Sequence, residues 1–229
     1  MTDAGYWNVA SPGSLPARVS RYQRRRMFQG FLDNLAPAPS DTIADVGVTS
    51  DREHDHSNYL EAWYPHKSQI TAVGIEDASF LEHVFPGVTF IRASGTALPF
   101  ANDSFDFVHS SAVIEHAGGF IQQTQLLSEI WRIARRGVFV TTPNRWFPIE
   151  LHTVLPLLHY LPPRQYRLIL KKIGLGFFAE ESNLNLMSAR TLSLASSNAG
   201  LTNFSVRSAR LFGLTSNLLL IAKKTATPV

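Results

Sequence analysis

The chain has 229 residues, a length typical of one domain with at most a modest extension. Hydrophobic residues make up 45% and charged residues 17%, so the composition supports a sizeable core and excludes a chain that is disordered throughout. The 21 basic and 18 acidic residues leave a formal charge of +3, which excludes the broadly basic surface of a protein that coats nucleic acid.

The chain contains no cysteine, which excludes a disulfide framework, a thiolate nucleophile and a cysteine-ligated metal. Its first 15 residues lack the basic start and apolar run of a secretory signal. No stretch reaches the roughly 18 apolar residues that a membrane-spanning helix needs. We therefore expect a soluble, cytoplasmic protein.

The first 40 residues are expected to form an arm and one helix ahead of a single domain over residues 41–229. Residues 1–17 are rich in glycine, serine and proline and predict a loose arm. From Arg18, apolar residues at helical spacing predict an amphipathic helix that ends before Pro37. The basic run at 24–26 suits a solvated face better than a grip on phosphate or on an anionic membrane.

Beyond residue 41, short apolar runs alternate with helical patterns. Runs rich in β-branched and aromatic residues predict strands at 42–46, 69–75, 88–92, 105–111 and 137–142. Helices are predicted at 58–64, 79–84 and 120–135, the first capped by Asn58 and the last closed by Arg135, Arg136 and Gly137. This alternation predicts a Rossmann-like α/β fold, a mostly parallel sheet with helices on both faces.

The C-terminal third breaks this alternation twice. Residues 146–187 contain four prolines among apolar and basic residues, and we expect them to form an inserted segment over one edge of the sheet. After a helix at 188–198, strands at 204–211 and 217–222 are joined by too few residues for a helical crossover, which predicts a C-terminal antiparallel hairpin. A plain dinucleotide fold has no such hairpin, and no G-x-G-x-x-G follows the first strand, which argues against a nicotinamide-dependent oxidoreductase.

Ligands of an open α/β sheet bind beyond the carboxyl ends of its strands. In the loop after the first strand, Gly47 permits a positive φ and a close approach of the backbone to a ligand. After the second strand, Glu76 and Asp77 place carboxylates where one of them can accept both hydroxyls of a ribose. Further along, the run 93–100 (Ala-Ser-Gly-Thr-Ala-Leu-Pro-Phe) precedes the fourth strand, and Glu115-His116 follows it.

In this order, the residues resemble the class I S-adenosylmethionine-dependent methyltransferases, in particular the small-molecule branch with a type 11 domain. The resemblance runs from Thr42 to Asn144 and rests on Asp45 with Gly47, Glu76, Leu98-Pro99-Phe100, Phe105-Asp106 and Glu115-His116. It implies S-adenosylmethionine as the cofactor. The residues that it places around this cofactor are Asp45, Gly47, Thr49, Glu76, Asp77, Ser94, Gly95, Thr96, Ser110 and Ser111.

The resemblance also implies a role for each group. The loop after the first strand would hold the methionine part and Glu76 the ribose, while Asp77 and residues 94–96 would border the adenine. Ser110 and Ser111 would stand beside the reactive methyl. Free N–H groups where a loop enters a helix suit the methionine carboxylate, which agrees with this placement.

The sequence departs from the family at three positions. Thr49 and Asp51 stand where the first loop usually has glycine, and Ser94 stands where an acid that binds adenine is common. A second reading therefore stays open, a catalytically silent methyltransferase-like module that serves as a binding or scaffold subunit, because a fold does not dictate activity.

Methyl transfer from a sulfonium needs mainly alignment and exclusion of water, and a base is optional. For a hydroxyl or carbon acceptor, the first candidate for a catalytic residue is His116 and the second is His152, because histidine titrates near neutral pH. The segment 142–152 should form the acceptor wall. Its aromatic residues, with the basic residues after it, suit a small or lipid-linked acceptor with an anionic head and a peripheral membrane contact.

The segment 51–56 contains two histidines and three carboxylates, and a charged surface loop explains them better than a metal site does. We therefore expect no metal. No nucleic-acid partner is expected, and the oligomeric state does not follow from the sequence.

Overall fold

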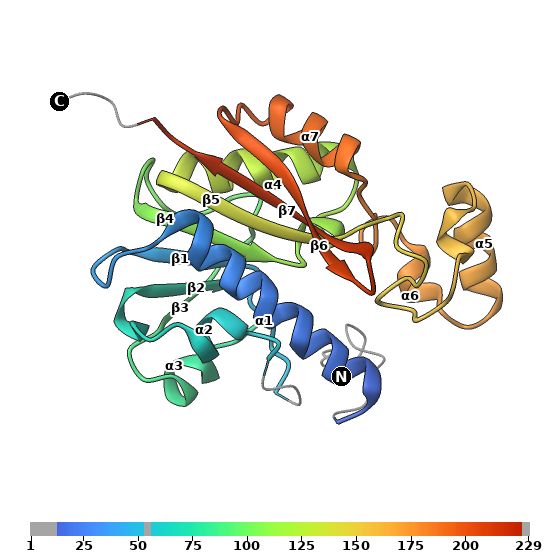
Figure 1. Cartoon of the computed structure of the whole chain (residues 1–229), viewed down its shortest axis with the longest axis horizontal. Helices are drawn as coiled ribbons and strands as arrows, with labels where there is room; N and C mark the ends of the chain where they lie inside the picture. The colour runs from blue at the N-terminus through green and yellow to red at the C-terminus, as the bar shows by residue number, and fades with distance from the viewer. Residues whose placement is uncertain (1–12, 53–55, 226–229) are drawn as a thin grey trace.

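A seven-stranded sheet runs through the centre of the computed structural model, which describes residues 13–52 and 56–225 (Figure 1). Along the sheet the strands are ordered β3-β2-β1-β4-β5-β7-β6. Their bounds are β1 (Ile43–Val46), β2 (Ile70–Gly74), β3 (Thr89–Arg92), β4 (Phe105–Ser111), β5 (Ala134–Pro143), β6 (Phe204–Leu211) and β7 (Leu214–Lys223).

The first five strands pair in parallel, and β7 pairs antiparallel with both β5 and β6. This arrangement confirms the predicted mostly parallel sheet with a C-terminal antiparallel hairpin. The hairpin turn is shorter than predicted, because β7 begins at Leu214. Phe212 and Gly213 form the turn, and both have a positive φ, of 51° and 81°. Such a tight turn matches the twist of the two strands.

Helices cover both faces of the sheet, as Figure 1 shows. On one face α1 (Leu15–Leu35), α2 (Tyr59–Trp63) and α3 (Phe80–Val84) bury Phe31, Leu60 and Leu81 in one apolar cluster. On the other face α4 (Phe120–Ile133) and α7 (Ala189–Asn198) bury Ile130 and Leu192 in a second cluster. Because both faces are covered, the central strands are nearly continuously buried, and all four residues of β1 are buried.

Two predicted helix ends differ from the structure by two residues or more, and one predicted helix cap is not formed. Helix α1 begins at Leu15 rather than Arg18, because the Ser14 hydroxyl accepts a hydrogen bond from the first turn and a proline presets the helical φ. Helix α4 ends at Ile133, and Arg135 with Arg136 belongs to β5. Asn58 precedes α2 but makes no side-chain hydrogen bond to that helix. The expected arm falls mostly on residues 1–12, which lie outside the described residues.

Between β5 and α7 the chain leaves the sheet and forms η4 (Leu158–Tyr160), α5 (Pro163–Lys172) and α6 (Gly176–Ala179). Figure 1 shows α5 and α6 set off at one end of the molecule. These elements have an apolar cluster of their own around Tyr166, Leu170 and Phe178. We call this segment, residues 144–187, the cap. Among the described helices, none combines the length and the hydropathy needed to cross a membrane.

Candidate functional site

The loop after β1 packs directly on the loop after β4. Gly47 has a φ of 100°, and its N–H donates to the Val73 carbonyl at 2.7 Å. A Cβ at position 47 would lie 2.9 Å from Cβ and 2.7 Å from Cγ1 of Val113, and closer still to Cγ2. Glycine is therefore required here for both its backbone conformation and its lack of a side chain. Among the described residues, the side chain packed against Gly47 is that of Val113.

The Asn58 side chain fixes the course of the loop after β1. Its Oδ1 accepts from the Thr49 N–H at 2.9 Å, and its Nδ2 donates to the Thr49 carbonyl at 2.9 Å. The predicted helix cap at Asn58 was therefore wrong, because the amide bonds this loop instead of the first turn of α2. Residues 53–55, which include His54 of the charged segment, lie outside the described residues.

The two acids after β2 point in different directions. Glu76 is half-buried, and its Oε2 accepts a hydrogen bond from the Ser50 hydroxyl, so its carboxylate is turned toward the loop after β1. Asp77 is exposed and accepts from the Ser79 N–H at 3.0 Å. That N–H bond, together with the Ser79 hydroxyl, lowers the pKa of Asp77. Glu76 is thus the acid that faces the edge of the sheet where a ligand is expected.

The loop after β3 lies beside the end of β2, since the Ala93 N–H donates to the Gly74 carbonyl at 2.9 Å. The hydroxyls of Ser94 and Thr96 are 2.9 Å apart and bond each other. A Cβ at Gly95 would lie 2.6 Å from a methyl of Leu126, so this loop is pressed onto α4. The structure therefore brings these three residues to the same edge of the sheet as Glu76.

Asp45, Ser110 and Ser111 use their side chains within the sheet. Asp45 is buried and accepts from His109 Nδ1 at 2.7 Å. The Ser110 hydroxyl donates to the Val46 carbonyl at 2.7 Å, and the Ser111 hydroxyl lies 2.9 Å from that of Thr141. The contacts of Asp45 and Ser110 join β1 to β4 just before the loops that follow these strands. Both side chains therefore hydrogen-bond to protein groups in this structure.

A buried polar set extends from Asp45 and was not predicted. The Tyr59 hydroxyl lies 2.8 Å from Nε2 of His109, and both residues are almost fully buried. Glu61 is fully buried close by, and burial, with the charge of Asp45, raises its pKa well above the ordinary value. These residues lie within apolar stretches, so the sequence pattern gave no signal that their polar ends would meet.

The two histidines predicted as catalytic lie together beyond β4 and β5. His116 ends η3 (Ile114–His116) and His152 lies in the cap, with ring centroids 4.8 Å apart. His116 Nδ1 lies 2.6 Å from the Asn183 carbonyl. Since a carbonyl only accepts, this nitrogen donates. In His152, Nδ1 lies 2.7 Å from a carboxylate oxygen of Glu150.

Two glutamates complete this group. Glu115 is fully buried, with Oε2 accepting from the Thr142 hydroxyl at 2.8 Å and Oε1 3.9 Å from His152 Nε2. Glu150 accepts from the backbone N–H groups of His152 and Thr153 and from the Thr153 hydroxyl. We call Glu115, His116, Glu150 and His152 the histidine–glutamate cluster. Glu115 was expected only as part of the family resemblance, and Glu150 was not predicted as a site residue.

Burial and mutual contact set the protonation of this cluster. Burial, with a smaller contribution from His152, lowers the pKa of His116 to about 3, so its ring is neutral at pH 7. Burial alone would raise the pKa of Glu150, but His152 and the hydroxyl and N–H donors hold it at about 2. Glu150 in turn raises the pKa of His152 against the effect of burial. The cluster thus combines a neutral imidazole with a buried ion pair.

The basic run at 24–26 is engaged within the protein. Arg24 donates to the His56 carbonyl at 2.7 Å, and the Arg25 guanidinium lies 4.3 Å from the centre of a Trp63 ring. Arg26 donates to the Arg210 carbonyl. Arg25 and Arg26 are exposed, as expected for a solvated face, whereas Arg24 is half-buried, and each of the three also contacts another element.

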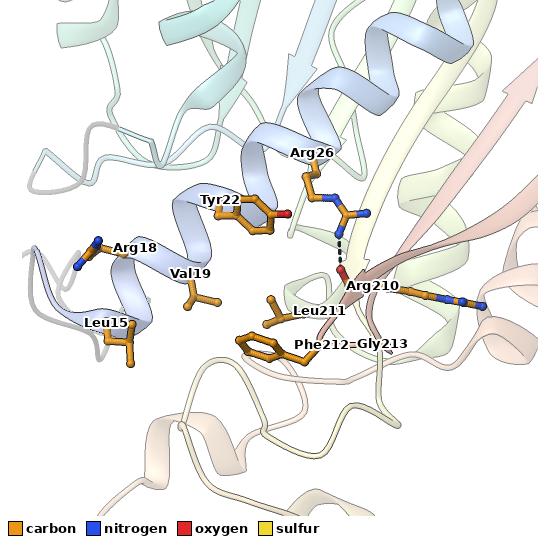
Figure 2. Close-up of a pocket in the computed structure, with 9 residues that line it drawn as sticks. All are labelled: Leu15, Arg18, Val19, Tyr22, Arg26, Arg210, Leu211, Phe212 and Gly213. Carbon is orange, nitrogen blue, oxygen red and sulfur yellow. Dashed lines mark hydrogen bonds between the residues drawn. The ribbon is translucent and has the colours of Figure 1, made fainter.

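A surface hollow lies between the first turns of α1 and the β6–β7 turn (Figure 2). In Figure 2 the Phe212 and Tyr22 rings border it, together with Arg18 and Arg26. None of its lining residues belongs to those expected to bind the cofactor or the acceptor.

Comparison with protein families matches residues 56–141 to the methyltransferase domain. An uncharacterized methyltransferase of Mycolicibacterium vanbaalenii is 43% identical over 90 residues, which are 38% of this chain and 33% of that protein. A second, from Mycobacterium avium, is 44% identical over 75 residues, which are 32% of this chain and 28% of that protein. The matched part therefore spans about a third of the length of these relatives.

Solved structures share the fold at low sequence identity. A possible exported protein from Bordetella parapertussis has a TM-score of 0.61 at 16% identity, covering 95% of this chain and 77% of that one. A geranyl diphosphate methyltransferase in complex with S-adenosylmethionine has a TM-score of 0.58 at 14% identity, covering 94% and 93%. A magnesium protoporphyrin IX methyltransferase from Synechocystis PCC 6803, with bound S-adenosylhomocysteine, has a TM-score of 0.56 at 15% identity, covering 92% and 86%.

Proposed function

We propose that this chain is a class I S-adenosylmethionine-dependent methyltransferase and that it transfers a methyl group from S-adenosylmethionine to a small or lipid-linked acceptor. The methyltransferase domain matched over residues 56–141 supports the family and the cofactor, and the fold shared with solved methyltransferases agrees with both. The acceptor, the atom methylated and the activity itself are our proposal.

The observation that carries this proposal is the orientation of Glu76. Its half-buried carboxylate is turned toward the loop after β1, and the contact with Ser50 engages only one of its two oxygens among the described residues. A carboxylate can accept from both hydroxyls of a ribose in this position at the end of the second strand. The residues present therefore fit the adenosyl part of the cofactor. The other cofactor-contacting residues proposed are those predicted from the resemblance.

S-adenosylmethionine supplies the methyl: an acceptor lone pair bonds to the methyl carbon while the carbon–sulfur bond breaks, and the sulfur keeps the electron pair to give S-adenosylhomocysteine. The chain's own task is to align the two reactants and exclude water. We assign His116 and His152 to the acceptor side. The neutral His116 ring can accept a hydrogen bond from an acceptor hydroxyl, whose proton is released to water after transfer.

The cap supplies the wall for the acceptor in this proposal. Trp146 and Leu151, just beyond β5, are both exposed, and Lys171 and Lys172 follow on α5. An apolar surface with cations nearby suits an acceptor with an apolar body and an anionic head. We also propose that the cap makes a peripheral contact with a membrane. Residues 41–229, the cap included, form one domain in this proposal.

A silent binding or scaffold module is the alternative, and one observation favours it. Val113 lies against Gly47, where the methionine part is expected to pass. The side chains at Thr49 and Asp51 add bulk to the same loop. If these groups stay in place, the fold is kept and the cofactor is not bound.

Calorimetric titration of the full chain with S-adenosylmethionine and with S-adenosylhomocysteine tests the proposal, with NAD as a control ligand. A charged hydrogen-bond partner contributes about 1.5–3 kcal/mol, so Glu76→Ala should raise the Kd about 10- to 150-fold. Glu82→Ala removes a carboxylate that instead accepts from the Phe90 N–H on an exposed surface, and it should leave the Kd unchanged. Binding of neither sulfur ligand at millimolar concentration would support the scaffold reading.

A further inference from the structure

The histidine–glutamate cluster has the composition of a metal site. One donor atom each from Glu115, His116 and His152 lies within 4.8 Å of the other two. Two of these residues come from η3 after β4, and the third comes from the cap, so the set forms only when the cap is folded against the sheet. Of the charged segment at 51–56, in which no metal was expected, the described residues 51, 52 and 56 are not part of this group.

Each of the three side chains is held through its other polar atom. His116 donates from Nδ1 to the Asn183 carbonyl at 2.6 Å, and His152 has Nδ1 2.7 Å from Glu150. Glu115 accepts from the Thr142 hydroxyl through Oε2. Metal-binding histidines in proteins are typically held in this way, with the second ring nitrogen donating to a carbonyl or a carboxylate. Because Nδ1 of each ring is engaged in this way, Nε2 is the ligand atom of both histidines, and the Nε2 of His152 gives up its proton when an ion binds.

An independent observation comes from the remaining oxygen of Glu115. Oε1 is fully buried and accepts no hydrogen bond from any described residue. A buried carboxylate oxygen that accepts no hydrogen bond loses the stabilisation that water gave it in the unfolded chain. This oxygen lies 3.9 Å from His152 Nε2, on the side where the two imidazoles converge. A cation bound between these atoms would replace that stabilisation.

We propose that Glu115, His116 and His152 bind one divalent transition-metal ion, such as zinc, manganese, iron, cobalt or nickel. Two imidazoles and one carboxylate suit these ions better than magnesium or calcium, which prefer oxygen ligands alone. Around an ion bound at about 2.1 Å, donor atoms are about 3.0–3.4 Å apart, so binding draws the present ligands closer together.

Three protein ligands leave coordination positions open, as in catalytic metal sites. The role of an open position rests on the proposed function, because this position would hold an oxygen of the methyl acceptor. With the ion bound, the acceptor oxygen contacts the ion in place of the His116 ring. The ion would thereby orient that oxygen and lower the pKa of its hydroxyl.

Titration of the full-length, chelator-treated protein with cobalt(II) tests the site without using activity. The expected result is one ion per chain and a visible absorption band of coordinated cobalt, with zinc competing for the site and magnesium not. His152→Asn should weaken binding at least 100-fold. His159→Asn is the matched control, because His159 is also a buried cap histidine and it bonds the Phe147 carbonyl and not the cluster. It should bind cobalt as the unmodified protein does.

Circular dichroism establishes that each variant is folded. If His152→Asn does not fold, Thr142→Ala serves instead, because it leaves every ligand in place and frees Glu115 from its hydroxyl donor. Loss of such an outer partner should weaken binding about 10- to 100-fold. Absence of stoichiometric cobalt binding, or equal affinity in His152→Asn and His159→Asn, would overturn the proposal.

The two proposals fail in different measurements. Cobalt binding without binding of S-adenosylhomocysteine keeps the metal site and removes the proposed methyl transfer. Binding of S-adenosylhomocysteine without any transition-metal binding keeps the methyltransferase and removes the metal site.

Discussion

Replacing Gly47 by alanine tests the direct packing of the loops after β1 and β4. At this position φ is 100°, outside the ordinary left-handed region of residues with a side chain. The added methyl would also lie 2.7 Å from Cγ1 and 2.9 Å from Cβ of Val113, and closer to Cγ2. Because three carbon atoms are too close at once, rotation of the valine side chain cannot relieve every contact.

The size of the effect follows from these two contributions. A residue with a side chain in a sparsely populated φ region costs about 1–3 kcal/mol, and overpacking costs about 1–3 kcal/mol more. We expect Gly47→Ala to lower the free energy of unfolding by about 2–6 kcal/mol, a large share of the stability of a domain. In the double variant with Val113→Ala the two γ carbons are absent, so most of the overpacking cost should disappear.

Urea unfolding followed by circular dichroism measures both quantities. Gly200→Ala is the control for the backbone contribution, because Gly200 has a φ of 80° and no heavy atom within 4 Å of an added Cβ. It should cost about 1–2 kcal/mol. If Gly47→Ala costs no more than Gly200→Ala, or if its coupling with Val113→Ala is below about 0.5 kcal/mol, the argument from loop packing is refuted.

Two further predictions concern other parts of the molecule. The pKa of buried Glu61 is raised above the 4.5 of an ordinary glutamate, so the folded state keeps a proton that the unfolded chain releases, and stability falls as the pH rises above about 4.5. Glu61→Gln should therefore stabilise the protein more at pH 7.5 than at pH 4.5 in urea unfolding, and an equal effect at both pH values would contradict the burial argument. In the cap, Leu170→Ala should cost about 2–4 kcal/mol, because Leu170 is fully buried in a cluster separate from the sheet. Amide hydrogen exchange should speed up in α5 and α6 but not in β4 or β5, and equal acceleration in all four would show that the cap does not unfold separately.

Strands were predictable because their signal is local. The runs at 105–111 and 204–211 match β4 and β6 to the residue. β4 is almost continuously buried and mostly apolar, whereas β6 is an edge strand in which only Ala209 is buried and polar residues alternate with larger apolar ones. Helix ends were less predictable. The positive charges of Arg135 and Arg136 are typical of the end of a helix, but β5 follows α4 without a loop and includes both residues. Their guanidinium nitrogens lie 2.6 Å (Arg135) and 3.9 Å (Arg136) from Oδ1 of Asp106.

Side-chain partners at the site could not be predicted in the same way. His116 and His152 could each be chosen as polar residues after strand ends, yet nothing in the sequence placed their rings 4.8 Å apart. The same holds for Asn58, whose amide could serve a helix or a loop equally well, and for Val113 against Gly47. Each of these contacts joins segments that meet only after the sheet has formed.

The sequence alone determined the order of helices and strands, the reversal of the last strand and the edge of the sheet where ligands are expected. Hydrophobic periodicity and connection length are properties of short segments, and these are enough to decide such features. Which side chains face one another at that edge was decided by the tertiary structure. The order β3-β2-β1-β4-β5 sets the spacing between the loops, and the cap, anchored beyond β5, then brings His152 to Glu115 and His116.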